Sequence, residues 1–84
     1  MQHLTLFSTS GCHLCALAEN IIADVSAQSG GIKLEIVDIA DSDTLFEAYG
    51  LMIPVLRHVS GDELHWPFTQ QSLLHFLRAA GWGG

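Results

Sequence analysis

Residues 9–15 read Thr9-Ser10-Gly11-Cys12-His13-Leu14-Cys15, and this stretch holds both cysteines of the 84-residue chain. It lies between a short apolar segment and a longer segment with helical periodicity. A C-x-x-C pair at a strand-turn-helix junction is typical of a redox-active dithiol. The sequence therefore predicts chemistry at the two sulfur atoms, at the point where a strand turns into a helix.

Cys12 is the predicted nucleophile and Cys15 the predicted resolving thiol. Disulfide exchange needs a thiolate, and a sulfur in the first turn of a helix faces unpaired N–H groups and the positive end of the helix dipole. Cys15 lies one turn further along the same face, from which it can displace a substrate held on Cys12 as a mixed disulfide. His13 has two interpretations: an imidazole that stabilises the Cys12 thiolate or accepts a proton, or an exposed residue without a role.

The composition favours one folded domain over residues 1–84, because 49% of the residues are hydrophobic and 14% are charged. The net charge is -6, and the basic residues Lys33, Arg57 and Arg78 are scattered along the chain, so neither nucleic acid nor an anionic membrane is an expected partner. We expect a cytoplasmic monomer. In a reducing compartment a C-x-x-C pair is expected to be catalytic or metal-binding rather than purely structural.

Hydrophobic periodicity predicts the order β-α-β-α-β-β-α. The predicted strands cover residues 3–8, 32–39, 55–59 and 63–66, and the predicted helices begin near Leu14, after Asp41-Ser42-Asp43 and after Thr69. In the first helix, Leu14, Cys15 and Ala18 are expected to share a buried stripe. A strand-helix-strand start needs parallel strands and a hairpin adds antiparallel ones, so the fold class is α/β with a four-stranded mixed sheet between helices.

The second motif is Tyr49-Gly50-Leu51-Met52-Ile53-Pro54-Val55-Leu56. With the preceding C-x-x-C it resembles the short bacterial glutaredoxin-like proteins of the thioredoxin-fold superfamily, over nearly the whole chain. The resemblance implies a thioredoxin-like fold and thiol-disulfide oxidoreductase activity. It also implies a cis Ile53-Pro54 bond beside the cysteines, with the Ile53 backbone groups free to pair with an extended substrate. Ile53 and Pro54 are then the expected substrate-binding residues.

Three features that accompany glutathione use in this family are replaced here. His13-Leu14 stands in place of Pro-Tyr between the cysteines, Ser8-Thr9-Ser10 in place of a segment with a basic residue, and Trp66-Pro67-Phe68-Thr69 in place of Gly-Gly-x-x-Asp. The chain is also acidic, which disfavours binding of the glutathione carboxylates. We therefore expect a disulfide-containing protein or a small thiol as the partner and no bound cofactor, with glutathione a weaker candidate.

Met52 and Trp66 are the weaker candidates for contact with substrate: Met52 as a soft contact near the thiols or a gap-filler, Trp66 as an aromatic wall or a packed residue. An alternative function is a binding module, which either holds a soft metal such as Zn or Cu(I) through Cys12 and Cys15 or serves only for docking. Small metal carriers with C-x-x-C end in a strand and lack the Ile-Pro segment. This chain is predicted to end in a helix, which favours the oxidoreductase.

Overall fold

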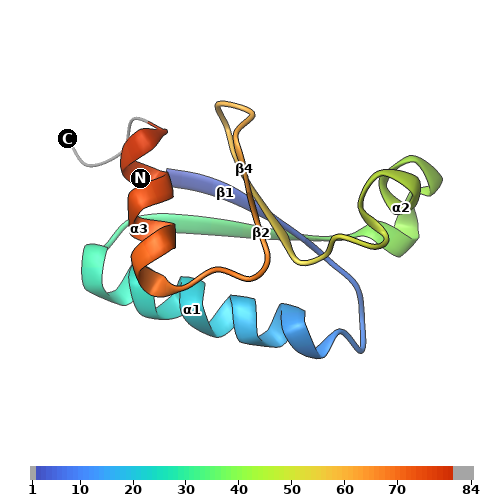
Figure 1. The fold of residues 1–84 in the computed structure, drawn as a ribbon, viewed down its shortest axis with the longest axis horizontal. Coiled ribbons are helices and arrows are strands. Elements are labelled where there is room, and N and C mark those ends of the chain that lie inside the picture. The colour runs from blue at the N-terminus through green and yellow to red at the C-terminus, as the bar shows by residue number, and fades with distance from the viewer. Residues whose placement is uncertain (1, 81–84) are drawn as a thin grey trace.

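The computed structural model describes residues 2–80, which form a four-stranded sheet, three α-helices and one 3-10 helix (Figure 1). The strands are β1 (Gln2–Ser8), β2 (Ile32–Asp38), β3 (Val55–His58) and β4 (Glu63–His65). The helices are α1 (His13–Ser29), α2 (Asp43–Tyr49) and α3 (Gln70–Ala79), and the 3-10 helix η1 (Ile39–Asp41) precedes α2. The predicted order is confirmed, except that η1 takes Ile39 from the end of the second predicted strand.

The strand order is β2-β1-β3-β4. β1 pairs in parallel with β2 and antiparallel with β3, and β3 and β4 form an antiparallel hairpin. The predicted mixed sheet is therefore confirmed. β2 and β4 are its edge strands.

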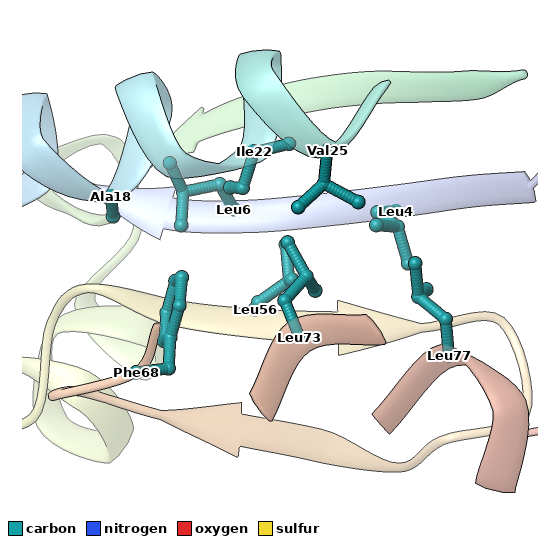
Figure 2. Packing of buried hydrophobic residues seen from close by; sticks show 9 residues of the cluster. All are labelled: Leu4, Leu6, Ala18, Ile22, Val25, Leu56, Phe68, Leu73 and Leu77. Carbon is teal, nitrogen blue, oxygen red and sulfur yellow. The ribbon is translucent and has the colours of Figure 1, made fainter. Parts of the chain in front are cut away.

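The main core lies on the face of the sheet that is covered by α1 and α3. Alternate residues of β1 and β3 point toward these helices, since side chains along a strand alternate between the two faces. Figure 2 shows the buried cluster: Leu4, Leu6, Ala18, Ile22, Val25, Leu56, Phe68, Leu73 and Leu77. At its edge, Thr69 caps α3 with a capping box to Ser72. Phe68 and Leu73, the residues on either side of this first turn, both belong to the cluster, as in a hydrophobic staple.

A second cluster lies on the opposite face, only at the carboxyl end of β1. Phe7, Val55 and Ile39 form its buried centre, and Leu45 and Tyr49 of α2 pack against them. Helices therefore cover both faces at this end alone. The rest of this face is polar, and its exposed side chains include His3, Lys33, Glu35 and Arg57.

The prediction that Leu14 shares a buried stripe with Cys15 is wrong. The buried residues of α1 are Cys15, Ala18, Ile22 and Val25, whereas Leu14 is 43% exposed and Leu17 is 40% exposed. At 100° per residue, Leu14 and Leu17 lie on one flank of this stripe. The helix packs on only one sheet face, so this flank stays in solvent and leaves two exposed apolar side chains, Leu14 and Leu17, in the first half of α1.

Candidate dithiol active site

A tight turn carries the chain from β1 into α1. The Cys12 N–H donates to the Thr9 carbonyl oxygen at 3.3 Å, and Gly11, the third residue of the turn, has a φ of 77°. A type II turn requires a positive φ at this position, which favours glycine. Gly11 thus allows the turn that places Cys12 at the start of the helix.

Cys12 is the N-cap of α1, and its side chain fulfils the role that a serine or aspartate oxygen usually has. Its Sγ accepts a hydrogen bond from the Cys15 N–H at 3.2 Å. The two cysteines form a disulfide, with their Cα atoms 5.2 Å apart. The pair can therefore exist in the oxidised form within this fold.

The two sulfurs differ in access, as the sequence predicts. Cys15 is 2% exposed, whereas Cys12 is partly exposed. The first turn of α1 contains no acidic residue, so no carboxylate there offsets the positive end of the helix. These features favour a reactive thiolate at Cys12 once the disulfide is reduced.

His13 is the first residue of α1 and its side chain is exposed. Over residues 2–80 its side chain takes part in no hydrogen bond or ion pair. Its position beside Cys12 in sequence leaves both interpretations of His13 open.

Pro54 immediately precedes β3, near the turn that carries the cysteines. The Ile53-Pro54 peptide is cis, as the resemblance implies, and a second cis peptide, Trp66-Pro67, was not predicted. Phe7 pairs with Val55, so continuing the register places Pro54 beside Ser8, the last residue of β1. Pro54 is buried and Ile53 is half-buried.

The prediction that both backbone groups of Ile53 are free for a substrate is wrong for the N–H. The N–H groups of Ile53 and Met52 both donate to the Tyr49 carbonyl oxygen, at 3.1 Å and 2.8 Å. The chain turns back sharply after α2, which brings both donors to one acceptor. The Ile53 carbonyl group is left as the candidate contact.

Tyr49 fixes the end of α2 on the sheet, a role that the sequence analysis missed. Its hydroxyl donates to Glu63 Oε2 at 2.5 Å, and its ring stacks on Phe7 with the centroids 4.5 Å apart. The hydrogen bond to Glu63 raises the pKa of Tyr49, burial and the negative charge of Glu63 raise it further, and Arg57 opposes the shift. The only signal in the sequence was an aromatic residue next to the Ile-Pro motif.

Replacing Tyr49 with phenylalanine is expected to lower the free energy of unfolding by about 1 kcal/mol at neutral pH, because the stacking on Phe7 stays and one hydrogen bond is lost. Because the pKa of Tyr49 is raised, the difference in unfolding free energy between wild type and Tyr49→Phe depends on pH. Below about pH 10, the usual tyrosine pKa, the contribution is fully present, and it is lost as the pH rises through the higher pKa of the folded state. Urea unfolding from pH 7 to 11 checks this, and a difference that grows with pH would contradict it.

Gly50 is the C-cap of α2, and crowding explains why this position holds a glycine. A Cβ at this position would lie 2.6 Å from the Phe46 carbonyl oxygen, and the φ of Gly50 is an ordinary -54°. The left-handed conformation that usually accompanies a glycine at a helix end is absent here. The close approach instead leaves room only for glycine at the start of the loop.

Met52 and Trp66 lie in different surroundings. Met52 is 40% exposed and lines, with Phe46 and Leu51, a hollow of about 500 Å³ beside α2. Its contact with a substrate stays a prediction. Trp66 packs against the main core and meets the Phe68 ring edge-on, with the ring centroids 5.1 Å apart. Its contact with a substrate also stays a prediction.

Metal ligands do not gather in the described part of the chain: residues 2–80 hold no group of three or more His, Cys, Asp or Glu side chains placed to bind an ion.

None of the helices in this range has the length and apolar character needed to cross a membrane.

The strand order, the helices and the position of the cysteines define a thioredoxin-like α/β protein with its dithiol at the start of α1. Residues 3–78 match the family described as glutaredoxin-like domain (DUF836), and the chain belongs to this family. No curated protein matches the chain.

Solved structures of bacterial proteins agree with this assignment. The X-ray structure of target protein XcR50 from X. campestris is 41% identical, with a TM-score of 0.79 over 90% of this chain and 96% of that chain. The solution structure of XcR50 is 42% identical, also with a TM-score of 0.79, over 94% of this chain and 95% of that one. Protein Ne2328 from Nitrosomonas europaea is 23% identical, with a TM-score of 0.76 over 89% of both chains, and is similar in fold.

Proposed function

We propose that the protein is a thiol-disulfide oxidoreductase in which Cys12 attacks the substrate and Cys15 resolves the intermediate. The observation that carries this proposal is the asymmetry of the pair: a partly exposed sulfur caps the helix, and a sulfur that is 2% exposed lies one turn behind it. Attack requires access and thiolate character at one sulfur. The second thiol needs only to reach the first, and the Cys12–Cys15 disulfide supports this role for Cys15.

The reaction has two exchange steps. The Cys12 thiolate attacks one sulfur of the substrate disulfide, a mixed disulfide forms, and the other substrate sulfur leaves as a thiolate that takes a proton from water. The Cys15 thiolate then attacks the Cys12 sulfur, which releases the second substrate thiol and leaves the Cys12–Cys15 disulfide. Two electrons have passed to the substrate, and an external thiol reductant restores the dithiol.

The surroundings of the cysteines fit a protein disulfide better than glutathione. Leu14, two residues after Cys12, has an exposed apolar side chain, and the Ile53 carbonyl and Pro54 are the proposed contacts for an extended segment. Lys33 and Arg57 line the polar face of the sheet, opposite to α1, and are poorly placed to bind glutathione carboxylates at the thiols. We place the reaction in a reducing, cytoplasmic compartment, because the pair must be re-reduced after each turnover.

His13 is proposed to assist Cys12 by charge. We expect His13→Ala to raise the pKa of the Cys12 thiol only slightly, because the exposed imidazole is screened by solvent and the helix dipole stays in place. Thiolate absorbance followed against pH in the Cys15→Ser background measures this pKa. An unchanged curve would assign His13 no role.

The proposal is tested by mixing the reduced protein with insulin, whose chains are joined by disulfides, or with a small aromatic disulfide. We expect two thiols to be consumed per chain, an internal disulfide to form, and a dithiol reductant to reopen it and sustain turnover. Protein with both cysteines carboxymethylated is the control. If the thiols do not react and instead bind zinc or Cu(I) stoichiometrically, the metal-carrier alternative replaces the proposal.

A further inference from the structure

The two edge strands of the sheet, β2 and β4, differ in how much unpaired backbone they offer to another strand. β4 is an edge strand of three residues, whereas β2 has seven residues, pairs with β1 without interruption from Ile32 to Asp38, and contains no proline. A long regular edge strand offers unpaired N–H and C=O groups to another strand, and natural proteins usually shorten, bend or cover such edges. Within residues 2–80, no strand pairs with the outer side of β2.

The side chains of β2 carry a self-complementary pattern. Lys33 and Glu35 are exposed on the polar face of the sheet, and neither belongs to an ion pair with another residue of the described chain. On the other face Ile36 is 49% exposed. A basic and an acidic residue two positions apart can pair twice when the same strand runs in the opposite direction beside it.

We propose that β2 is the site of self-association and pairs antiparallel with β2 of a second copy, in the register centred on Leu34. In this register Lys33 lies opposite Glu35 of the partner copy, Glu35 lies opposite the partner copy's Lys33, and Ile36 lies opposite the partner copy's Ile32. Registers centred on Lys33 or Glu35 place like charges opposite each other, which is destabilising. Charge complementarity therefore selects one register for the proposed pairing.

The flank of α1 beside β2 also suits close approach of a second copy. Glu19, Asn20 and Ala23 line, with Ile32 and Leu34, a hollow of about 370 Å³ between α1 and β2. The exposed residues on this side of the helix are short, and a helix spacing of three to four residues brings them together: Ala16, Asn20, Ala23 and Ala27. Apart from Glu19, which lines the hollow, these side chains leave room for two α1 helices to lie near each other over the joined strands.

The dimer leaves both dithiols accessible. β1 runs parallel to β2, and an antiparallel partner reverses the direction of its own β1. The two Cys12 residues, which follow the carboxyl ends of β1, therefore lie toward opposite ends of the joined sheet. The inference does not depend on the proposed redox function, since it uses no residue of the active site.

Sedimentation equilibrium of the full chain tests the proposal through charge exchange. Lys33→Glu and Glu35→Lys each turn two attractive pairs into two repulsive ones, so each is expected to raise the dimer dissociation constant at least about tenfold. An equimolar mixture of the two variants is expected to form a heterodimer, and the double variant Lys33→Glu/Glu35→Lys to form a homodimer again. Arg78→Glu, the same charge change on α3, is the control and is expected to leave the constant unchanged.

The combined results of the charge-exchange variants distinguish this pairing from a general effect of net charge on association. Recovery in both the mixture and the double variant supports opposition of residues 33 and 35 across a two-fold axis. A wild-type protein that stays monomeric at millimolar concentration overturns the proposal. The proposal also fails if the single substitutions leave the dimer dissociation constant unchanged. It fails as well if neither the mixture nor the double variant forms a dimer again.

Discussion

Cys12→Ser is expected to reduce disulfide-reducing activity to the uncatalysed background, the largest effect on function of any single change in this chain. A serine hydroxyl is not ionised at neutral pH and cannot form the mixed disulfide. The helix should survive, because the serine oxygen can cap α1 in place of the sulfur that now accepts the Cys15 N–H. The measurement is the insulin reduction rate beside the urea midpoint, and lost activity with an unchanged midpoint is the expected result.

Cys15→Ser is the matched variant, because it removes a thiol from the same pair but keeps the attacking sulfur. We expect a single exchange step, after which the substrate stays on Cys12 as a mixed disulfide that mass spectrometry detects. Turnover should then depend on an added thiol. If Cys12→Ser trapped the substrate and Cys15→Ser did not, the two roles would be reversed.

Leu6→Ala is expected to cause the largest loss of stability. Leu6 is 0% exposed on the central strand β1 and belongs to the cluster formed with α1 and α3 (Figure 2). Removing a fully buried leucine side chain costs about 2–5 kcal/mol, a large share of the roughly 5–15 kcal/mol that holds a small domain folded. We expect partial or complete unfolding at 37 °C.

Leu51→Ala is the matched control, because it makes the same chemical change at a side chain that is 104% exposed. Leu51→Ala is expected to lower the free energy of unfolding by less than about 0.5 kcal/mol. Urea unfolding of the two variants and the wild type checks both values. Equal midpoints for Leu6→Ala and Leu51→Ala would contradict the assignment of the core.

Much of the fold could be predicted because local signals agreed with the tertiary structure. The alternating residues of β1 mark it as a strand. The turn residue Gly11 and the cap Thr69 mark where α1 and α3 begin, through local chemistry alone. The dithiol was equally clear, because its two members lie one helical turn apart. The cis bond before Pro54 required the family resemblance, because only about 5% of X-Pro bonds in folded proteins are cis.

The remaining features depend on which residues meet across the sheet. The hydrogen bond between Tyr49 and Glu63 joins α2 to β4, and it exists only because Phe7 and Glu63 share one face of the folded sheet. The Ile53 N–H is occupied because of a turn whose geometry is not visible in residue types. The exposure of Leu14 similarly depends on how α1 is rotated on the sheet. Sequence periodicity gives an apolar face for α1, but it does not fix which flank meets the core.

The central claim, that Cys12 is the reactive thiolate, is tested most directly by alkylation of the reduced protein as a function of pH, with each cysteine followed by peptide mass spectrometry. We predict that at neutral pH iodoacetamide modifies Cys12 faster than Cys15, and that the Cys12 rate titrates with an apparent pKa below the ordinary value of about 8.5. Cys15, which is 2% exposed, should react slowly throughout. Faster modification of Cys15, or a Cys12 rate that titrates at or above the ordinary cysteine pKa, would contradict the account.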